Sequence, residues 1–105
     1  MVRVTGKKMM PPPMAPLQVL LVTYDLKSPG WNYEPFYSAL RDQGKWLHYI
    51  TATWLIATPN TPEGVYNAIG PHLTTKDFVL ILPVGRPAFG FLPQEAWDWI
   101  NSNVP

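Results

Sequence analysis

The chain contains no cysteine, and that absence removes several classes of chemistry. It excludes disulfide bonds, cysteine-ligated zinc sites and thiol nucleophiles. A chain without disulfides suits a reducing compartment, so we expect a cytoplasmic location. Long hydrophobic runs are lacking too, because no apolar stretch approaches the ~18 residues that a membrane helix needs. Arg3, Lys7 and Lys8 precede no apolar segment of signal-peptide length, so no secretion signal is expected.

Clustered positive charge is also scarce. Residues 14–105 contain five basic and seven acidic side chains, which gives a net charge of −2. Proteins that bind nucleic acids usually carry a basic stripe, because neutralising phosphates supplies most of their non-specific affinity. The charge balance therefore argues against strong, non-specific binding to DNA or RNA, and it supports a nucleic-acid partner only weakly.

The length and the aromatic content indicate one domain with a substantial core. The 105 residues are 47% hydrophobic and include five Trp, five Tyr and four Phe. Single domains cluster near this length, and each buried aromatic removes about 150–250 Å² from water. Four prolines fall between residues 11 and 16, where they deny the backbone its donors. We expect a disordered lead over residues 1–16 and one domain over residues 17–105.

Hydrophobic periodicity divides the domain into strands and helices. The expected elements are, in order, a strand at 17–26, a helix at about 33–42, two strands within 46–58 that separate near 51–53, a helix from 61 to about 69, a strand at 77–84 and a last helix at 93–101. A single long, bent strand over 46–58 is the alternative, because no glycine marks the turn. Residues 86–91 form a Gly/Pro loop that has room for a short edge strand.

Local signals support the first two helices. Asn32 can cap the first, and Pro35 falls in its first turn, where a missing N–H is harmless. Thr61, Pro62 and Glu63 give the second a cap, a proline at the first position and an acid near the positive end of the helix dipole. Each helix is therefore expected to begin at a defined residue.

The order of the elements favours an α+β fold. The series β-α-β-β-α-β belongs to the ferredoxin-like split β-α-β sandwich, in which an antiparallel sheet carries both helices on one face. The last helix is short and apolar and needs a surface to cover, either on its own sheet or on a partner's. We therefore expect a ferredoxin-like sandwich with an additional C-terminal short strand and helix.

Asp25 is the candidate for catalysis and for metal binding. It ends the first, buried strand and precedes the turn-forming segment 27–30. The alternative is that its side chain caps this turn. One carboxylate is a poor magnesium site, since Mg²⁺ takes six oxygen ligands and usually one or two carboxylates with waters. A two-fold homodimer would bring two copies of Asp25 to one axis.

The remaining polar and aromatic candidates favour structural roles. His48 lies in an apolar strand, and His72 follows a helix end, where a cation suits the dipole. No convincing Ser-His-acid spacing, P-loop or dinucleotide pattern is present. Several aromatics can stack on bases in an RNA-binding sheet, although packing in a core or a dimer is the simpler interpretation. They are Tyr24, Trp31, Tyr49, Trp54, Phe89 and Phe91.

Seven short segments carry a further pattern over most of the domain. They are YDL at 24–26, PG at 29–30, YEPFYSAL at 33–40, WLHY at 46–49, TWLI at 53–56, PHL at 71–73 and LPQEAWDWI at 92–100. Together they resemble the SinR-like small prokaryotic proteins, which sit in the CRISPR-associated Cas-two-like superfamily with VapD-type toxins. The likeness covers about residues 17–101 and is looser for true Cas-two proteins.

The resemblance implies a ferredoxin-like homodimer. It also implies either a metal-dependent endonuclease that uses Mg²⁺ or Mn²⁺, or a DNA-bound structural scaffold. Asp25 matches the acid at the end of the family's first strand, where two such acids face each other across the dimer and hold the metal. The family often follows this acid with basic residues in the first helix, whereas here Lys27, Glu34, Arg41 and Asp42 form no cluster.

Three hypotheses follow from these observations. The first is a metal-dependent nuclease that acts on RNA or DNA through paired Asp25 residues. The second is a non-catalytic dimeric adaptor that binds protein or nucleic acid through its sheet and its tail, which contains Trp97 and Trp99. The third is a sensor with a small molecule or nucleotide in the dimer cleft.

Overall fold

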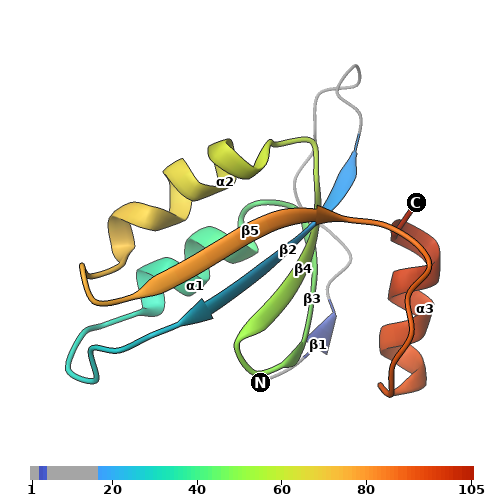
Figure 1. Cartoon of the computed structure of the whole chain (residues 1–105), viewed down its shortest axis with the longest axis horizontal. Helices are drawn as coiled ribbons and strands as arrows, with labels where there is room; N and C mark the ends of the chain where they lie inside the picture. Colours follow the sequence, from blue (N-terminus) through green and yellow to red (C-terminus); the bar gives the residue numbers. More distant parts are fainter. Residues whose placement is uncertain (1–2, 5–16) are drawn as a thin grey trace.

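A computed structural model describes residues 3–4 and 17–105 of the chain (Figure 1). These residues have the expected α+β structure, with an antiparallel sheet of five strands and three α-helices. In chain order the elements are β1 (Arg3–Val4), β2 (Gln18–Asp25), α1 (Glu34–Arg41), β3 (Lys45–Ile50), β4 (Thr53–Thr58), α2 (Pro62–Ile69), the 3-10 turn η1 (Gly70–His72), β5 (Phe78–Val84) and α3 (Gln94–Asn103).

The predicted elements are largely confirmed, with two differences. β3 and β4 are separate strands around Thr51 and Ala52, so the single bent strand is wrong. The expected edge strand at 86–91 does not form, and this segment is a loop in which Pro87 has no N–H to donate. The predicted disordered lead lies outside the described residues except for Arg3–Val4, which pair with β3 as β1.

Both helix starts follow local hydrogen bonding. α1 begins at Glu34, one residue later than predicted, and the Asn32 side-chain oxygen accepts a hydrogen bond from the Glu34 N–H at 3.1 Å. In α2 the Thr61 hydroxyl oxygen accepts from the Gly64 N–H at 3.0 Å, as the sequence predicts. Each side chain satisfies an N–H that the helix itself leaves without a partner.

The sheet has the strand order β1-β3-β4-β2-β5, with every neighbouring pair antiparallel. Side chains alternate between its faces. Leu20 and Val22 on β2 point toward α1 and α2, and they bury a core with residues from both helices. This core contains Leu20, Val22, Phe36, Leu40, Trp54, Ile56, Val65 and Ile69. Val65 and Ile69 of α2 face this core and are both completely buried.

The third helix packs on the opposite face of the sheet. The short, apolar last helix covers its own sheet, because Ala96, Trp99 and Ile100 of α3 are buried against Val19 and Leu47. Figure 1 shows α3 at one end of the molecule, away from α1 and α2. Its last turn is held by Arg86, whose guanidinium donates to the Val104 carbonyl at 3.1 Å. Such a cation also suits the negative end of a helix. α3 covers only one end of this face of the sheet, because Phe78 and Leu80 at the other end of β5 remain exposed.

Gly44 links α1 to β3 at a position that has no room for a side chain. Its φ is +154°, and a Cβ would lie 2.1 Å from the Ala57 carbonyl oxygen. Its close approach to β4 explains why glycine stands there. The turn lets Lys45 pair with Ala57 directly.

Candidate functional site

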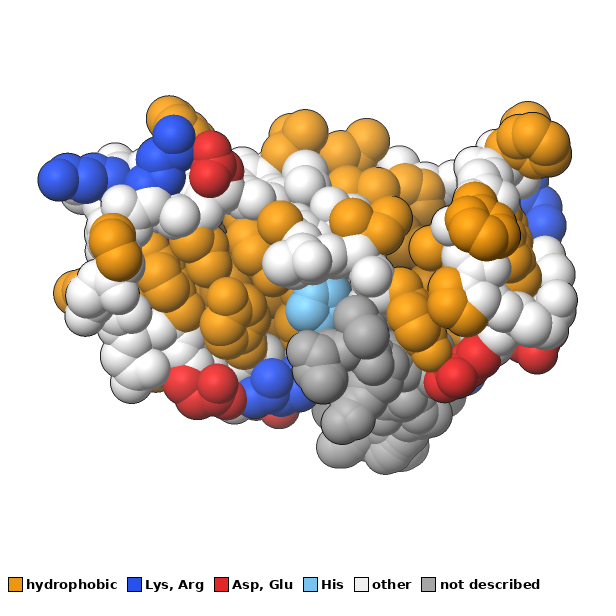
Figure 2. Space-filling view, turned by 90° about the horizontal axis from the view of Figure 1, so that it is seen from below, with side chains coloured by type: hydrophobic (Ala, Val, Ile, Leu, Met, Phe, Trp, Pro, Cys, Tyr) orange, Lys and Arg blue, Asp and Glu red, His pale blue; other side chains and the backbone are white. Residues whose placement is uncertain are grey.

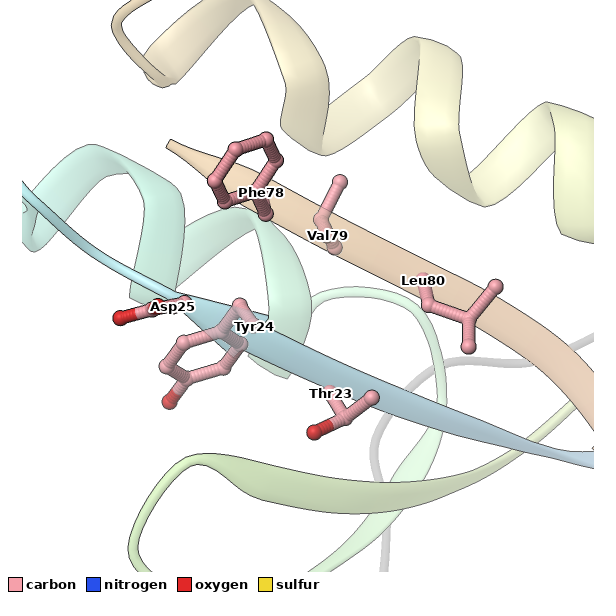
Figure 3. A pocket seen from close by; sticks show the side chains of 6 residues that line it. All are labelled: Thr23, Tyr24, Asp25, Phe78, Val79 and Leu80. Carbon is pink, nitrogen blue, oxygen red and sulfur yellow. The ribbon is translucent and has the colours of Figure 1, made fainter. Parts of the chain in front are cut away.

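Asp25 is the last residue of β2 and lies directly opposite Phe78 of β5 (Figure 3). Residues that face each other across an antiparallel pair project to the same side of the sheet. Thr23 opposite Leu80 and Leu21 opposite Leu82 continue this face toward α3. Asp25 therefore stands at the end of the α3 face that α3 leaves uncovered.

The neighbours of Asp25 on this face are hydrophobic and exposed. Phe78, Leu80 and Leu82 are 66%, 59% and 39% exposed. We call the surface formed by Asp25, Thr23 and these three residues the open face. A shallow hollow of about 260 Å³ lies beside Asp25, where Phe78 and Leu80 contribute to its lining (Figure 3). Exposed apolar patches of this kind often mark interaction surfaces.

Asp77, rather than Asp25, organises the turn after β2. The Asp77 Oδ1 atom accepts a hydrogen bond from the Lys27 N–H and another from the Tyr33 hydroxyl, each at 2.7 Å. Its Oδ2 atom accepts from the Thr74 N–H at 2.8 Å and from the Thr74 hydroxyl at 3.1 Å. These bonds tie the turn between β2 and α1 to the turn before β5.

The same hydrogen bonds shift the acidity of Asp77. Burial alone would raise the pKa of this carboxyl group, but the bonds from Lys27, Thr74 and Tyr33 stabilise the ionised form and outweigh burial. The pKa of Asp77 consequently falls from 3.8 to about 2. Asp77 is therefore a charged structural anchor at neutral pH.

Asp25 is thereby left available for other contacts. Its side chain is 64% exposed and forms an ion pair with Lys27, whose Nζ lies 3.3 Å from Oδ2. The ion pair is on the surface and contributes little to stability. The alternative role for Asp25, capping the turn, is taken by Asp77. Lys27 also lies over the Phe78 ring, 5.6 Å from its centroid, so the acid, the cation and the apolar surface adjoin.

One chain does not supply a complete metal site in the part that the structure describes. Among residues 3–4 and 17–105, no group of three or more His, Asp or Glu side chains is placed to hold a cation. Asp25 contributes two carboxylate oxygens, whereas Mg²⁺ takes six oxygen ligands. A second carboxylate from another copy, together with waters, would complete such a set.

The His48 side chain has a structural position, as the sequence predicts. The His48 ring stacks on Trp54 with a centroid distance of 4.3 Å and an interplanar angle of 17°. Its Nε2–H donates to the Thr51 carbonyl at 2.8 Å. Burial lowers the pKa of His48, and the bond to Thr51 opposes this shift only in part. His72 accepts a hydrogen bond through its backbone carbonyl from the Trp31 indole at 2.9 Å.

The aromatic residues considered for base stacking do not share one surface. Tyr24 and Trp54 lie on the α1 side of the sheet, whereas Tyr49 packs on the α3 side. Phe89 and Phe91 are fully exposed in the loop before α3. The six residues therefore form no single stacking platform.

The sequence missed two features. The first is Asp77, which was placed in a strand although the polar segment Thr74–Asp77 is a signal for a side-chain-stabilised turn. The second is a pocket lined by seven residues on the α1 side. They are Tyr24, Tyr37, Arg41, Trp46, His48, Thr51 and Trp54, and we call their site the aromatic pocket. No periodicity in the sequence brings α1 beside the end of β3, so this site needed the structure.

Comparison with known proteins gives no relative: no protein-family model, no curated protein and no solved structure matches the chain. None of the helices in residues 3–4 and 17–105 has the length and hydrophobicity to cross a bilayer.

Proposed function

We propose that this chain is a ferredoxin-like, Cas-two-like protein that acts as a homodimeric, metal-dependent endonuclease. The observation that carries the proposal is the exposed Asp25 at the end of β2, bordered by the hydrophobic open face. Asp77 organises the neighbouring turn, so Asp25 has no structural duty there. An exposed acid beside an unpaired apolar surface suits a site completed by a second copy.

The topology supports the fold part of the proposal. The four longer strands lie in the order β3-β4-β2-β5, and β4 separates β2 from β3. The helix α1 connects β2 to β3, and α2 connects β4 to β5. Such interleaved units define the split β-α-β sandwich.

The exposed side chains support a dimer. Phe78, Leu80 and Leu82 form an apolar surface on β5, and Phe89 and Phe91 extend the exposed hydrophobic surface along the following loop. Moving a Phe or Leu side chain from water into an interface contributes about 1.5–3 kcal/mol. Two open faces that meet around a two-fold axis would bury these residues and bring the two Asp25 carboxylates together.

Paired carboxylates give this surface its proposed chemistry. A divalent cation supplies a nucleophilic water at neutral pH and neutralises charge on the scissile phosphate. The role of Asp25 is to hold the cation from both protomers. Lys27, whose Nζ lies 3.3 Å from the Asp25 carboxylate, would contact a phosphate oxygen of the substrate. The overall reaction would be hydrolysis of a phosphodiester, in which the hydroxyl of water bonds to phosphorus, the bond from phosphorus to the leaving sugar oxygen breaks, and the water proton goes to that oxygen.

A cleavage assay tests this function. Short single-stranded and double-stranded RNA and DNA are incubated with Mg²⁺ or Mn²⁺ and the wild type, Asp25→Asn or Asp42→Asn. Asp42 is an exposed acid just beyond α1, so its variant controls for the loss of one negative charge. We expect Asp25→Asn alone to lose cleavage. Equal cleavage by all three proteins, or none by any, would contradict the proposal.

A non-catalytic adaptor is the second candidate, favoured by two fully exposed rings. Phe89 and Phe91 are 103% and 99% exposed, and the net charge of −2 over residues 14–105 suits a protein partner better than a nucleic acid. In that case, substituting both rings with serine would abolish the biological function, whereas Asp25→Asn would leave it intact. The nuclease proposal predicts instead that Asp25→Asn abolishes the function.

A further inference from the structure

The aromatic pocket lies within a single protomer and is separate from Asp25. It is bounded by Tyr37 and Arg41 of α1, and by Trp46, His48 and Trp54 of the β3–β4 hairpin. Its volume of about 470 Å³ falls within the ~300–1,000 Å³ that is usual for small-molecule sites. Figure 2 shows a face of the molecule on which a histidine lies beside hydrophobic side chains, with charged groups nearer the margin.

The walls of the pocket are fixed by hydrogen bonds and ring contacts. Trp54 is 2% exposed, and its indole N–H donates to the Tyr24 hydroxyl at 2.9 Å. The Tyr24 hydroxyl in turn donates to the Thr51 carbonyl at 3.4 Å. His48 is stacked on Trp54 and bonded to the same carbonyl. A site that is ordered before binding loses less conformational entropy when a ligand enters.

The lining combines half-buried rings with one charge. Tyr24, Tyr37 and His48 each keep part of their surface accessible. Burial raises the pKa of Tyr24 to about 12 and raises that of Tyr37, so both hydroxyls stay protonated at neutral pH. Among the lining residues that the structure describes, Arg41 is the one Lys, Arg, Asp or Glu side chain. The described part of the site therefore offers flat apolar surfaces, neutral hydroxyls and the positive charge of Arg41.

We propose that the aromatic pocket binds a single nucleotide, a nucleoside monophosphate, with its base against the rings and its phosphate at Arg41. Aromatic rings stack on nucleobases of any sequence, and a guanidinium recognises phosphate through paired hydrogen bonds. A longer strand would need several cations along its backbone, whereas the described lining of this pocket supplies one and residues 14–105 carry a net charge of −2. The site does not depend on Asp25 or on a dimer.

The Glu34–Arg41 ion pair permits a matched test. The Arg41 guanidinium donates to the Glu34 carboxylate at the rim, and both side chains are partly exposed. Arg41→Gln and Glu34→Gln break the same ion pair, so any effect on helix stability should be alike. Their effects on phosphate binding should be opposite, because one removes the cation and the other releases it.

The experiment titrates the full chain with AMP, GMP, CMP, UMP and adenosine. Binding is followed by calorimetry and by the NMR signals of the tryptophan indole N–H groups. We expect at least one monophosphate to bind saturably and to shift the Trp54 signal. AMP should bind about tenfold more tightly than adenosine, as expected for one charge-assisted contact. Arg41→Gln should remove this advantage, and Glu34→Gln should preserve or increase it.

Three results of the titrations with single nucleotides would overturn the proposal. They are no saturation with any monophosphate at millimolar concentration, equal affinities for AMP and adenosine, and equal weakening by Arg41→Gln and Glu34→Gln. Binding of oligonucleotides without binding of monophosphates would also overturn it. Asp25→Asn should bind nucleotide like the wild type, so the outcome here is independent of the cleavage assay.

Discussion

Replacing Asp77 with asparagine should weaken the hydrogen bonds that join the turn after β2 to the turn before β5. The variant should therefore be less stable than the wild type at neutral pH. The asparagine keeps one acceptor oxygen and places an amide NH₂ where the other oxygen accepted two hydrogen bonds. Hydrogen bonds to a charged group contribute about 1.5–3 kcal/mol each, and water near the surface replaces part of that loss. We therefore expect Asp77→Asn to lower the free energy of unfolding by about 2 kcal/mol at pH 7.

The loss should depend on pH with a defined sign. The pKa of Asp77 is lowered in the folded protein from 3.8 to about 2. A carboxyl group with a depressed pKa stabilises the fold above its unfolded value and loses that contribution as pH falls through the folded value. The free energy of unfolding of the wild type should therefore exceed that of Asp77→Asn by its full amount above about pH 5. This difference should disappear as the pH falls from about 4 to 2.

Urea unfolding followed by tryptophan fluorescence measures this gap. Asp42→Asn is the matched control, since Asp42 is an exposed acid whose replacement should change stability by less than about 0.5 kcal/mol. The anchoring role of Asp77 would be refuted by equal stabilities at pH 7. A gap that stays constant from pH 7 to pH 2 would refute the electrostatic explanation.

Three further perturbations test other parts of the account. Gly44→Ala should destabilise the fold by at least about 2 kcal/mol in urea unfolding, because its Cβ would strike the Ala57 carbonyl at a φ that favours glycine; wild-type stability would contradict the turn geometry. Thr61→Ala should cost about 1 kcal/mol through loss of the bond to the Gly64 N–H, and Thr61→Ser should restore most of it. Leu80→Lys should convert a dimer to a monomer in sedimentation without unfolding it, whereas Tyr66→Lys, on an exposed position of α2, should leave the dimer unchanged.

The sequence predicted the elements well because their signals are local. Thr61 and Pro62 mark the start of α2, and alternation of apolar residues marks β3 and β4. The start of α1 was one residue early, since Asn32 bonds to the Glu34 N–H from a turn position. The sequence allows a short edge strand at 86–91 because Phe89 and Phe91 are spaced two residues apart, as on one face of a strand. Pro87 and Gly90 disfavour strand pairing, and the segment is a loop.

The candidate site was predictable only in part. Asp25 could be placed at the end of a strand from hydrophobic patterning alone, but the turn that follows it is held by Asp77, which lies 52 residues later in the chain. The hydrogen bonds that join the two turns are long-range and leave no periodic signal. The aromatic pocket likewise joins α1 to the β3–β4 hairpin, and residues on two elements meet there only after the sheet has formed.

The most direct test of the central claim measures whether two Asp25 residues meet. The chain has no cysteine, so Asp25→Cys introduces a single thiol, and Glu63→Cys on α2 provides an exposed control away from the open face. Each variant is treated at low protein concentration with a short bifunctional thiol cross-linker. The account predicts efficient covalent dimers for Asp25→Cys and few for Glu63→Cys. Equal, inefficient cross-linking of both variants would contradict a paired Asp25 site.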